Sequence, residues 1–544
     1  MAYSDVASHQ SDGYHLRTTN SSSSDDDYSK EADSALLEVG LRGCGAGSSK
    51  NPRQWPWRSW LRRALRKLSP SFLHPWIRRK QHGGWELHPN PKPNPLSSTA
   101  WLDGLRGYAA FFVVWHHISL LYFPWSLHGG YEGRETDRLL QLPIVRLAIS
   151  GAPHVFVFFV ISGYALSHKT LRLLQEGGAD KGEEAYAALA SSAFRRHPRL
   201  FVPPVVLCLP VPLLAYAGWL GGQMPGAAAK AIDPTPLASL SEQFVDYARA
   251  ALELADPLAH RDGWTWVYNT SLWTLPHEFR GSLLVYGALL ALSRCNSIVR
   301  LLLTASMAVW ALYHVHWPQF LFLSGMLLAD SRLHSSHHTQ GEEDPGSSST
   351  LDGEWKSAAV SKHTNGWKST VTCKWSNRFL QATIQVMSYL FILYVLGTPP
   401  WHLGGDKTPG YIWLAQHVPS RYIDAKLADY FWPSIAAVAL VFVLDRSPLL
   451  QRLFMTPFAR YLGRISYSLY LVHIPILQGL GLWAGQFFVG LMGPETDSGY
   501  VAGVAAAVVV VWALVVWAAD LGWRFVDAPA VRFAGWAHRM VTMR

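Results

Sequence analysis

Long apolar segments recur along this chain of 544 residues, and they limit its possible folds more than any other feature. Each full segment is close to the roughly 20 residues that a helix needs to cross a bilayer. Because a spanning backbone must satisfy its own hydrogen bonds, segments of this length predict helices. We therefore predict an all-α, polytopic membrane bundle of about ten transmembrane helices. The segments lie at about 106–125, 147–167, 200–220, 272–292, 298–315, 317–330, 378–397, 429–446, 461–485 and 500–521.

The composition favours a membrane protein over a series of soluble domains. Apolar residues make up 49% of the chain, charged residues only 16%, and tryptophan occurs 25 times. The net charge of +9 comes from Lys and Arg in segments that the positive-inside rule assigns to the cytosol, so we expect no nucleic-acid partner. The four cysteines show no C-x-x-C spacing, which predicts neither a disulfide framework nor a zinc site.

Basic loops set the expected orientation of the bundle. The sequences "AFRRHPRL", "SRCNSIVR" and "DRSPLLQRLFMTPFARYLGR" follow the second, fourth and eighth segments. The positive-inside rule places these loops, and with them both chain ends, in the cytosol. We expect a multi-pass integral protein of the endoplasmic reticulum, another endomembrane or the plasma membrane. The sixth segment, 317–330, is short, so a re-entrant segment stays open there as an alternative.

The polar regions define the expected domain organisation. Residues 1–95 predict a disordered cytosolic tail with an interfacial amphipathic helix near 54–68, where tryptophans alternate with arginines. A nuclear-localisation or nucleic-acid patch is the alternative for that helix. The membrane domain is expected at 98–530, interrupted by a disordered cytosolic insertion at 331–377, and a cytosolic tail at 531–544 follows it. The "HSSHH" of the insertion could bind a metal ion, although a solvated loop is the favoured interpretation.

The first segment, "LDGLRGYAAFFVVWHHISLLYF", carries an arginine and two histidines where polar groups are costly. Eleven positions separate Arg106 from His117. This is about three helical turns, so both side chains lie on one face about 16 Å apart along the axis. His116 points about a quarter-turn away. A cation in line with a buried imidazole suits acyl-coenzyme A, which has an anionic head and a reactive far end. The alternative is a snorkelling arginine together with a histidine that only packs between helices.

Two further segments place charged residues beside apolar runs. In "FRRHPRLFVPP", Arg196 and Arg199 share a helix face and form a fork suited to phosphate, although topological charge accounts for any one arginine. In "SLWTLPHEFRGSLLVY", Glu278 needs a partner because an unpaired buried charge is costly. Either Arg280 nearby or His117 across the bundle could supply that partner.

A fourth segment, "YLGRISYSLYLVHIPIL", buries several hydroxyl groups and one histidine in the ninth apolar run. Hydroxyl groups of this kind often form hydrogen bonds between membrane helices. We interpret His473 first as a packing residue.

In this order, the segments resemble the acyltransferase-3 family of integral membrane acyltransferases. The first segment is similar to the family's first-span motif, an arginine followed by ten residues and a histidine, which ends here at His117. "VFFVISGYALS", "RRHPR", "SLWTLPHE" and "ISYSLYLVHIPI" look like its second-span, R-x-x-R, Trp-Ser-Leu-x-x-Glu and late-span motifs. The resemblance covers about residues 98 to 530. Its Glu segment departs from the family's common aromatic pair by continuing as Phe279-Arg280-Gly281.

The resemblance implies an O-acyltransferase that moves an acyl group, expected to be acetyl, from acyl-CoA to a hydroxyl of a small-molecule, secondary-metabolite, lipid or carbohydrate acceptor. His117 is then the general base, and Glu278 orients its imidazole or stabilises its charged form. Arg106, Arg196 and Arg199 hold the donor phosphates at the cytosolic face. We expect no permanently bound cofactor and no metal; the partners are acyl-CoA, the acceptor and the bilayer.

Two other functions are compatible with the same residues. A multipass transporter could use them to relay protons or to move acyl groups without acylating an acceptor. A membrane-bound isoprenoid cyclase is disfavoured because the chain offers no aspartate-rich site for diphosphate-bound magnesium. The long polar N-terminus and the 331–377 insertion look like those of filamentous-fungal family members, in which acceptors are often secondary metabolites.

Overall fold

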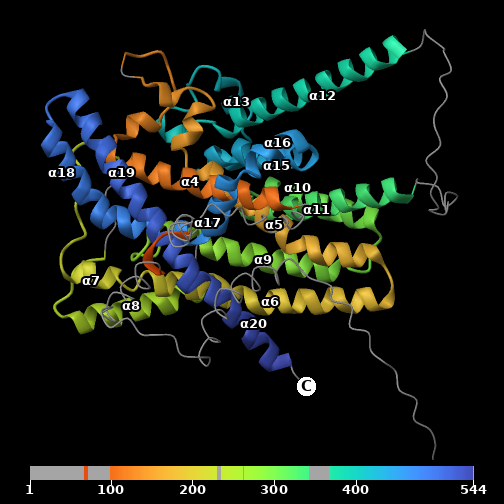
Figure 1. The fold of residues 1–544 in the computed structure, drawn as a ribbon, viewed down its shortest axis with the longest axis horizontal. Helices are drawn as coiled ribbons and strands as arrows, with labels where there is room; N and C mark the ends of the chain where they lie inside the picture. The colour runs from red at the N-terminus through yellow and green to blue at the C-terminus, as the bar shows by residue number, and fades with distance from the viewer. Residues whose placement is uncertain are drawn as a thin grey trace, which may run out of the picture. The chain divides into compact units, whose positions relative to one another are not determined.

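The computed structural model describes residues 67–71, 99–135, 137–228, 234–260, 263–341 and 367–542. Across these ranges the protein is mostly helical and contains no β-sheet (Figure 1). Most of the predicted N-terminal tail lies outside the described residues, as does the interfacial helix near 54–68 apart from its last two residues.

Every apolar segment of the sequence coincides with a helix. The long helices are α4 (Ala100–Tyr122), α5 (Ala152–Glu176), α6 (Ala179–Leu207), α8 (Leu240–Leu254), α9 (Thr274–Ala291), α10 (Ser297–Tyr313), α11 (Trp317–Gly341), α12 (Trp367–Leu396), α15 (Ala428–Arg446), α17 (Pro457–Ile476), α18 (Leu482–Met492), α19 (Asp497–Gly522) and α20 (Ala528–Thr542). Helices therefore occupy both described ends of the 331–377 insertion and most of the 531–544 tail.

Shorter elements connect these helices. They are the 3-10 helices η2 (Trp125–His128), η3 (Leu139–Gln141), η4 (Val145–Ile149), η5 (Thr270–Trp273) and η6 (Trp401–Leu403), the short helices α7 (Val211–Tyr216), α13 (Ile412–Gln416), α14 (Ser420–Asp424) and α16 (Pro448–Phe454), and the π-helical turns η7 (Leu477–Gly481) and η8 (Trp523–Asp527). The π-turns continue α17 into α18 and α19 into α20.

Five helical stretches of the described chain are long and apolar enough to cross a membrane, which indicates a multi-pass membrane protein. They are Ala179–Tyr216, Phe379–Leu396, Ala428–Arg446, Pro457–Met492 and Asp497–Thr542; the apolar α10 is shorter. The helices α4 and α9 fall outside this set because they carry the polar residues singled out above. In α4, Arg106 and two histidines lower the mean hydropathy.

Glycines bring α4 and α17 into backbone contact. A Cβ atom added at Gly107 would lie 2.4 Å from the backbone nitrogen of Gly463. One added at Gly104 would lie 1.8 Å from the carbonyl oxygen of Phe454 in the neighbouring α16. One added at Gly463 would in turn lie 2.3 Å from the carbonyl oxygen of Asp103. Small residues permit such close approach between membrane helices, so the polar residues of α4 and α17 meet directly.

A second close crossing joins α5 to α11. A Cβ atom at Gly163 would lie 2.1 Å from the carbonyl oxygen of Phe322, and one at Gly325 would lie 2.2 Å from that of Val160. The ring of Phe322 also fills the space where Gly281 of α9 lacks a side chain. These contacts fix both α5 and α9 against α11, and Glu278 of α9 also accepts a hydrogen bond from Ser162 of α5.

The connection between α4 and α5 is held by buried polar groups. Arg146 is buried and donates hydrogen bonds to the carbonyl oxygens of Gly397 at 2.7 Å and His128 at 2.8 Å. Burial lowers the pKa of His128 to about 4, so this side chain is neutral at physiological pH. The loop therefore forms a fixed cap beside the end of α4.

The short segment at residues 67–71 packs against the end of α19. Trp517 donates to the carbonyl oxygen of Leu68 at 2.8 Å, and Arg524 donates to that of Ser69 at 2.9 Å. Ser71 binds the carboxylate of Asp520 through its backbone N–H at 3.1 Å and its hydroxyl at 2.5 Å. These bonds anchor the chain that leads into the membrane domain.

Candidate active site

Helix α17 contacts three of the segments that the sequence analysis singled out. It carries the late-span motif, and its polar residues face one way along successive turns. Ser466 accepts a hydrogen bond from Arg106 at 3.1 Å, and the His473 ring lies 4.9 Å from the His117 ring between centroids, so two residues of α17 contact the first segment. Tyr467 donates to the carbonyl oxygen of Leu200 at 2.6 Å. The hydroxyl of Tyr470 lies 2.6 Å from that of Thr274.

Arg106 is fixed at the end of α4 that faces the start of α17. Its guanidinium donates to the hydroxyl of Ser466 at 3.1 Å and to the carbonyl oxygen of Gly463 at 3.2 Å. It also pairs with the carboxylate of Asp103 at 2.9 Å. About a third of the side chain is exposed, which leaves donor groups available to an anion.

The structure divides the predicted fork of Arg196 and Arg199. Arg196 binds Glu278 at 2.5 Å and donates to the hydroxyl of Ser282 at 2.8 Å. The same carboxylate oxygen of Glu278 accepts a hydrogen bond from Ser162 of α5 at 2.6 Å. Arg196 and Ser162 thus provide the partners that Glu278 needs, and among the described residues no hydrogen bond joins Glu278 to His117.

Arg280, the other candidate partner of Glu278, points elsewhere. Its guanidinium donates to the carbonyl oxygen of Pro257 at 3.0 Å and to that of His260. It therefore closes the loop before α9 rather than the site.

Arg199 is exposed, and within the described residues it forms no ion pair. Arg199 interacts electrostatically with Asp527, a half-buried carboxylate in the π-turn η8. Asp527 also interacts electrostatically with Arg106. Asp527 thus links two of the predicted arginines, and sequence reasoning missed it. The only signal was its position just beyond the last apolar run, in "WRFVDAP".

Tyr467 lies at the centre of this charged group. Its hydroxyl interacts electrostatically with Asp527, Arg196 and Glu278. The same hydroxyl donates a hydrogen bond to the carbonyl oxygen of Leu200. Tyr467 therefore lies between the helices that carry Arg196 and Glu278 and the turn that carries Asp527.

His117 lies further along α4, and its tautomer is fixed by its own helix. The Nδ1 atom lies 2.9 Å from the carbonyl oxygen of Val113, four residues earlier. Because a carbonyl oxygen only accepts, Nδ1 carries the hydrogen, and the neutral ring has its lone pair on Nε2. Helix α4 is continuous from Ala100 to Tyr122, so the spacing between Arg106 and His117 is that of an unbroken helix.

His116 has a different environment from His117. Its Nδ1 lies 2.7 Å from the carbonyl oxygen of Ile149, and its ring packs against the bare Cα of Gly151. The ring also contacts that of His128 at 5.5 Å between centroids. These contacts fix the connection between α4 and α5, in keeping with its quarter-turn offset from the Arg106 face.

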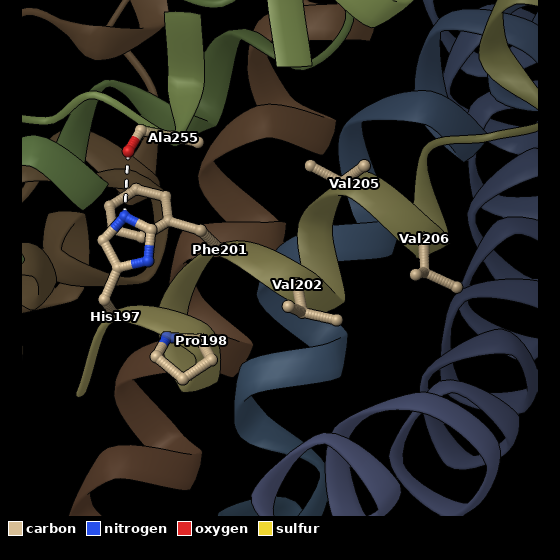
Figure 2. Close-up of a pocket in the computed structure, with 7 residues that line it drawn as sticks. All are labelled: His197, Pro198, Phe201, Val202, Val205, Val206 and Ala255. Carbon is tan, nitrogen blue, oxygen red and sulfur yellow. Dashed lines mark hydrogen bonds between the residues drawn. The ribbon is translucent and has the colours of Figure 1, made fainter. Parts of the chain in front are cut away.

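An apolar groove runs along α6 next to the arginines (Figure 2). Its volume is about 270 Å³. His197 closes one end by donating from Nε2 to the carbonyl oxygen of Ala255 at 2.8 Å, and the other walls carry no charge. Such a groove suits hydrocarbon rather than phosphate. Its lining residues are His197, Pro198, Phe201, Val202, Val205, Val206 and Ala255.

The described residues include no group of three or more His, Cys, Asp or Glu side chains that could hold a metal ion. The side chains that the site brings together are imidazoles, guanidinium groups, carboxylates and hydroxyl groups.

Comparison with known proteins identifies relatives over most of the chain. Residues 99–518 match the acyltransferase-3 family, described as an acyltransferase domain. The O-acetyltransferase PaAT-1 of Phomopsis amygdali is 37% identical over 457 residues, which cover 82% of this chain and 85% of the relative. No solved structure matches.

Two more distant relatives are also fungal proteins. The acyltransferase R4 of a Phoma species is 24% identical over 482 residues, covering 81% of this chain and 96% of the relative. The acyltransferase clz18 of Cochliobolus lunatus is 22% identical over 494 residues, covering 84% and 98%. The family match at residues 99–518 spans the helices that contribute Arg106, Arg196, Arg199, His117 and His473.

Proposed function

Since this chain belongs to the acyltransferase-3 family and is an O-acyltransferase, we propose that it transfers an acetyl group from acetyl-CoA to a hydroxyl of a small-molecule acceptor. A secondary metabolite is the first choice of acceptor, because the relative with 37% identity is a fungal O-acetyltransferase. Lipid and carbohydrate hydroxyls are the other classes to test.

The observation that carries the proposal is the fixed tautomer of His117 on the same helix as Arg106. With Nδ1 bonded to the carbonyl oxygen of Val113, Nε2 is free to act as a base. It takes the proton of the acceptor hydroxyl as the oxygen attacks the thioester carbonyl carbon. The C–S bond then breaks, and the thiolate of coenzyme A recovers the proton from His117.

The arginine end of the bundle binds the donor phosphates in this proposal. Arg106 and Arg199 are the primary ligands, because both keep exposed donor groups and both face Asp527, whose place an anionic phosphate could take. Arg196 contributes charge at the same end while it holds Glu278. Glu278 then acts by positioning Arg196, in place of the direct contact with His117 that we expected.

The proposed topology has ten spans, with both termini in the cytosol. Its support is the coincidence of ten apolar segments with helices and the excess of Arg in the joins assigned to the inside. This orientation puts the arginine end at the cytosolic face, where acetyl-CoA is found. We assign the protein to the endoplasmic reticulum, another endomembrane or the plasma membrane, with 1–95 and 531–544 as cytosolic tails and 331–377 as a cytosolic insertion.

The test uses the full chain purified into nanodiscs, with acetyl-CoA labelled on the acetyl group and a panel of terpenoid, polyketide, lipid and sugar alcohols. We expect acceptor-dependent release of free thiol together with a labelled ester. His117→Ala should lower the rate by about 10³-fold at normal expression, the order of a lost general base. Full activity of His117→Ala would refute the mechanism, and solute flux without thioester cleavage would favour a transporter.

A further inference from the structure

His473 is completely buried in α17 and has one nitrogen that no described residue satisfies. Its exposed fraction is 0%. Its Nδ1 lies 2.8 Å from the carbonyl oxygen of Tyr470, three residues earlier, so Nδ1 carries the hydrogen. Nε2 is therefore a lone-pair acceptor, and among the described residues it has no hydrogen-bond partner.

An unsatisfied buried acceptor is uncommon and requires an explanation. Buried polar atoms in folded proteins nearly always find a partner, because leaving one unpaired costs free energy. If this position served only for packing, leucine or phenylalanine would fill the space without burying an unsatisfied polar atom. The lone pair at Nε2 can accept a hydrogen bond from a donor that forms nearby during the working cycle.

The neighbouring side chain that can become such a donor is His117. The two rings lie 4.9 Å apart between centroids and are inclined by 60°. At this separation, ring nitrogens can come within hydrogen-bonding distance. In their neutral forms both rings present a lone pair at Nε2, so neither can donate to the other. Once Nε2 of His117 takes a proton, it becomes a donor to Nε2 of His473.

We propose that His473 is the partner of His117 that stabilises its charged form during acyl transfer, an inference that rests on the proposed function. The acceptor hydroxyl gives its proton to Nε2 of His117, and the oxygen forms the new C–O bond. Nε2 of His473 accepts a hydrogen bond from the resulting imidazolium. The C–S bond breaks, the thiolate recovers the proton, and both imidazoles return to their neutral forms, so no proton is gained or lost.

The surroundings of the pair contain no described carboxylate that could take this role. His116 lies beside His117 on the same helix, with ring centroids 5.1 Å apart, and His128 and His154 interact with His116. Tyr470 lies beside His473, but its hydroxyl is bonded to Ser271 and Thr274. Glu278 is held by Arg196 and Ser162.

The experiment measures the reactivity of His117 directly, because that needs no acceptor. Diethyl pyrocarbonate modifies neutral imidazole, and mass spectrometry gives its rate at His117 as a function of pH. We compare the wild-type chain with His473→Leu, which removes the acceptor, and with His473→Gln, which retains a weaker one. His154→Gln is the matched control, because His154 is also buried but has its Nε2 bonded to the carbonyl oxygen of Leu147 at 2.9 Å.

We expect the pH at half-maximal modification of His117 to fall by about one unit in His473→Leu, the order of a lost hydrogen bond to a charged group. The shift should be smaller in His473→Gln and absent in His154→Gln. If His473→Leu does not fold, the shift in His473→Gln decides. An unchanged midpoint in a folded His473 variant would overturn the proposal.

Acetyl transfer by the same proteins separates this inference from the proposed function. Wild-type protein that releases no thiol from acetyl-CoA with any alcohol of the panel would refute the function, whatever the midpoints show. Active wild-type protein with unshifted midpoints would refute the role of His473 alone. If both hold, His473→Leu should transfer acetyl at least tenfold more slowly, and His473→Gln should recover part of the loss.

Discussion

Arg300 and Asp330 form a closed ion pair between α10 and α11, whereas Arg196 and Glu278 form an open one between α6 and α9. In the closed pair, two nitrogens of Arg300 bind the two oxygens of Asp330 at 2.7 and 2.6 Å. Gln175 adds a bond to the same carboxylate at 2.9 Å. The side chains are only 3% and 1% exposed, so the pair has nothing left to offer a ligand.

The open pair uses its groups differently. A single oxygen of Glu278 receives both Arg196 at 2.5 Å and Ser162 at 2.6 Å, while the remaining bond of Arg196 goes to Ser282. The side chains are 11% and 15% exposed. A buried ion pair in which both carboxylate oxygens are bonded suits a structural role. An ion pair with unused carboxylate lone pairs and some exposure to solvent suits a site at which a substrate replaces an internal partner.

The largest expected effect comes from breaking the closed pair. Arg300→Leu leaves the buried charge of Asp330 unpaired and should lower the free energy of unfolding by about 3–5 kcal/mol. Loss of monodisperse protein after heating in detergent measures it. The double variant Arg300→Leu/Asp330→Leu should recover most of that loss, because both charges are gone. Equal stability of the single and wild-type proteins would remove the distinction between the two pairs.

Breaking the open pair should affect catalysis more than stability. Glu278→Gln keeps the shape but releases Arg196, which should lower kcat by about 10²-fold, the order of a misplaced reacting group. Because water can reach this pair, the loss in the free energy of unfolding should stay near 1–2 kcal/mol. Parallel measurement of kcat and thermal stability checks this. A loss of stability as large as that of Arg300→Leu would contradict the open character of the pair.

Arg199 sharpens the comparison because it is an arginine at the same site with no ion pair among the described residues. Arg199→Ala should raise KM for acetyl-CoA about tenfold, the order of a lost charge-assisted bond to phosphate, with stability unchanged. Arg195→Ala is the control, because Arg195 binds the carbonyl oxygen of Ser191 in its own helix at 3.1 Å. Similar KM values for both variants would remove Arg199 from the donor site.

The smallest effect should come from an exposed ion pair. Arg172 and Glu176 lie 3.5 Å apart on the surface of α5, with side chains 53% and 36% exposed. Arg172→Gln should change the free energy of unfolding by less than about 0.5 kcal/mol and leave kcat and KM as they are. A larger change in melting temperature would show that exposure is a poor guide to the role of ion pairs in this protein.

The helices and the family could be predicted from sequence because both depend on local patterns. Apolar runs of spanning length mark most of the long helices, although not α8 or α20. The Arg106 to His117 spacing is a property of any unbroken helix. The family resemblance is confirmed. Five of the ten predicted spans meet the criteria of length and hydropathy. Helices such as α4 do not, because their polar residues lower the mean hydropathy.

The pairings within the site could not be predicted, because they depend on which helices are neighbours. Nothing local to Glu278 distinguishes Arg196 from His117 as its partner. Asp527 escaped notice because its π-turn, which has no clear sequence signature, sets the direction of its side chain. His473 was interpreted as a packing residue, and only its distance from His117 and its unsatisfied nitrogen changed that interpretation.

The glycine contact between α4 and α17 restricts how this protein can evolve. Every residue other than glycine brings a Cβ atom, and at Gly107 and Gly463 that atom would overlap the backbone of the opposite helix. No single substitution there can be tolerated unless the two helices move apart, which would separate His117 from His473. In a library of random variants, active clones should therefore almost always keep glycine at these two positions, although neither residue takes part in the chemistry.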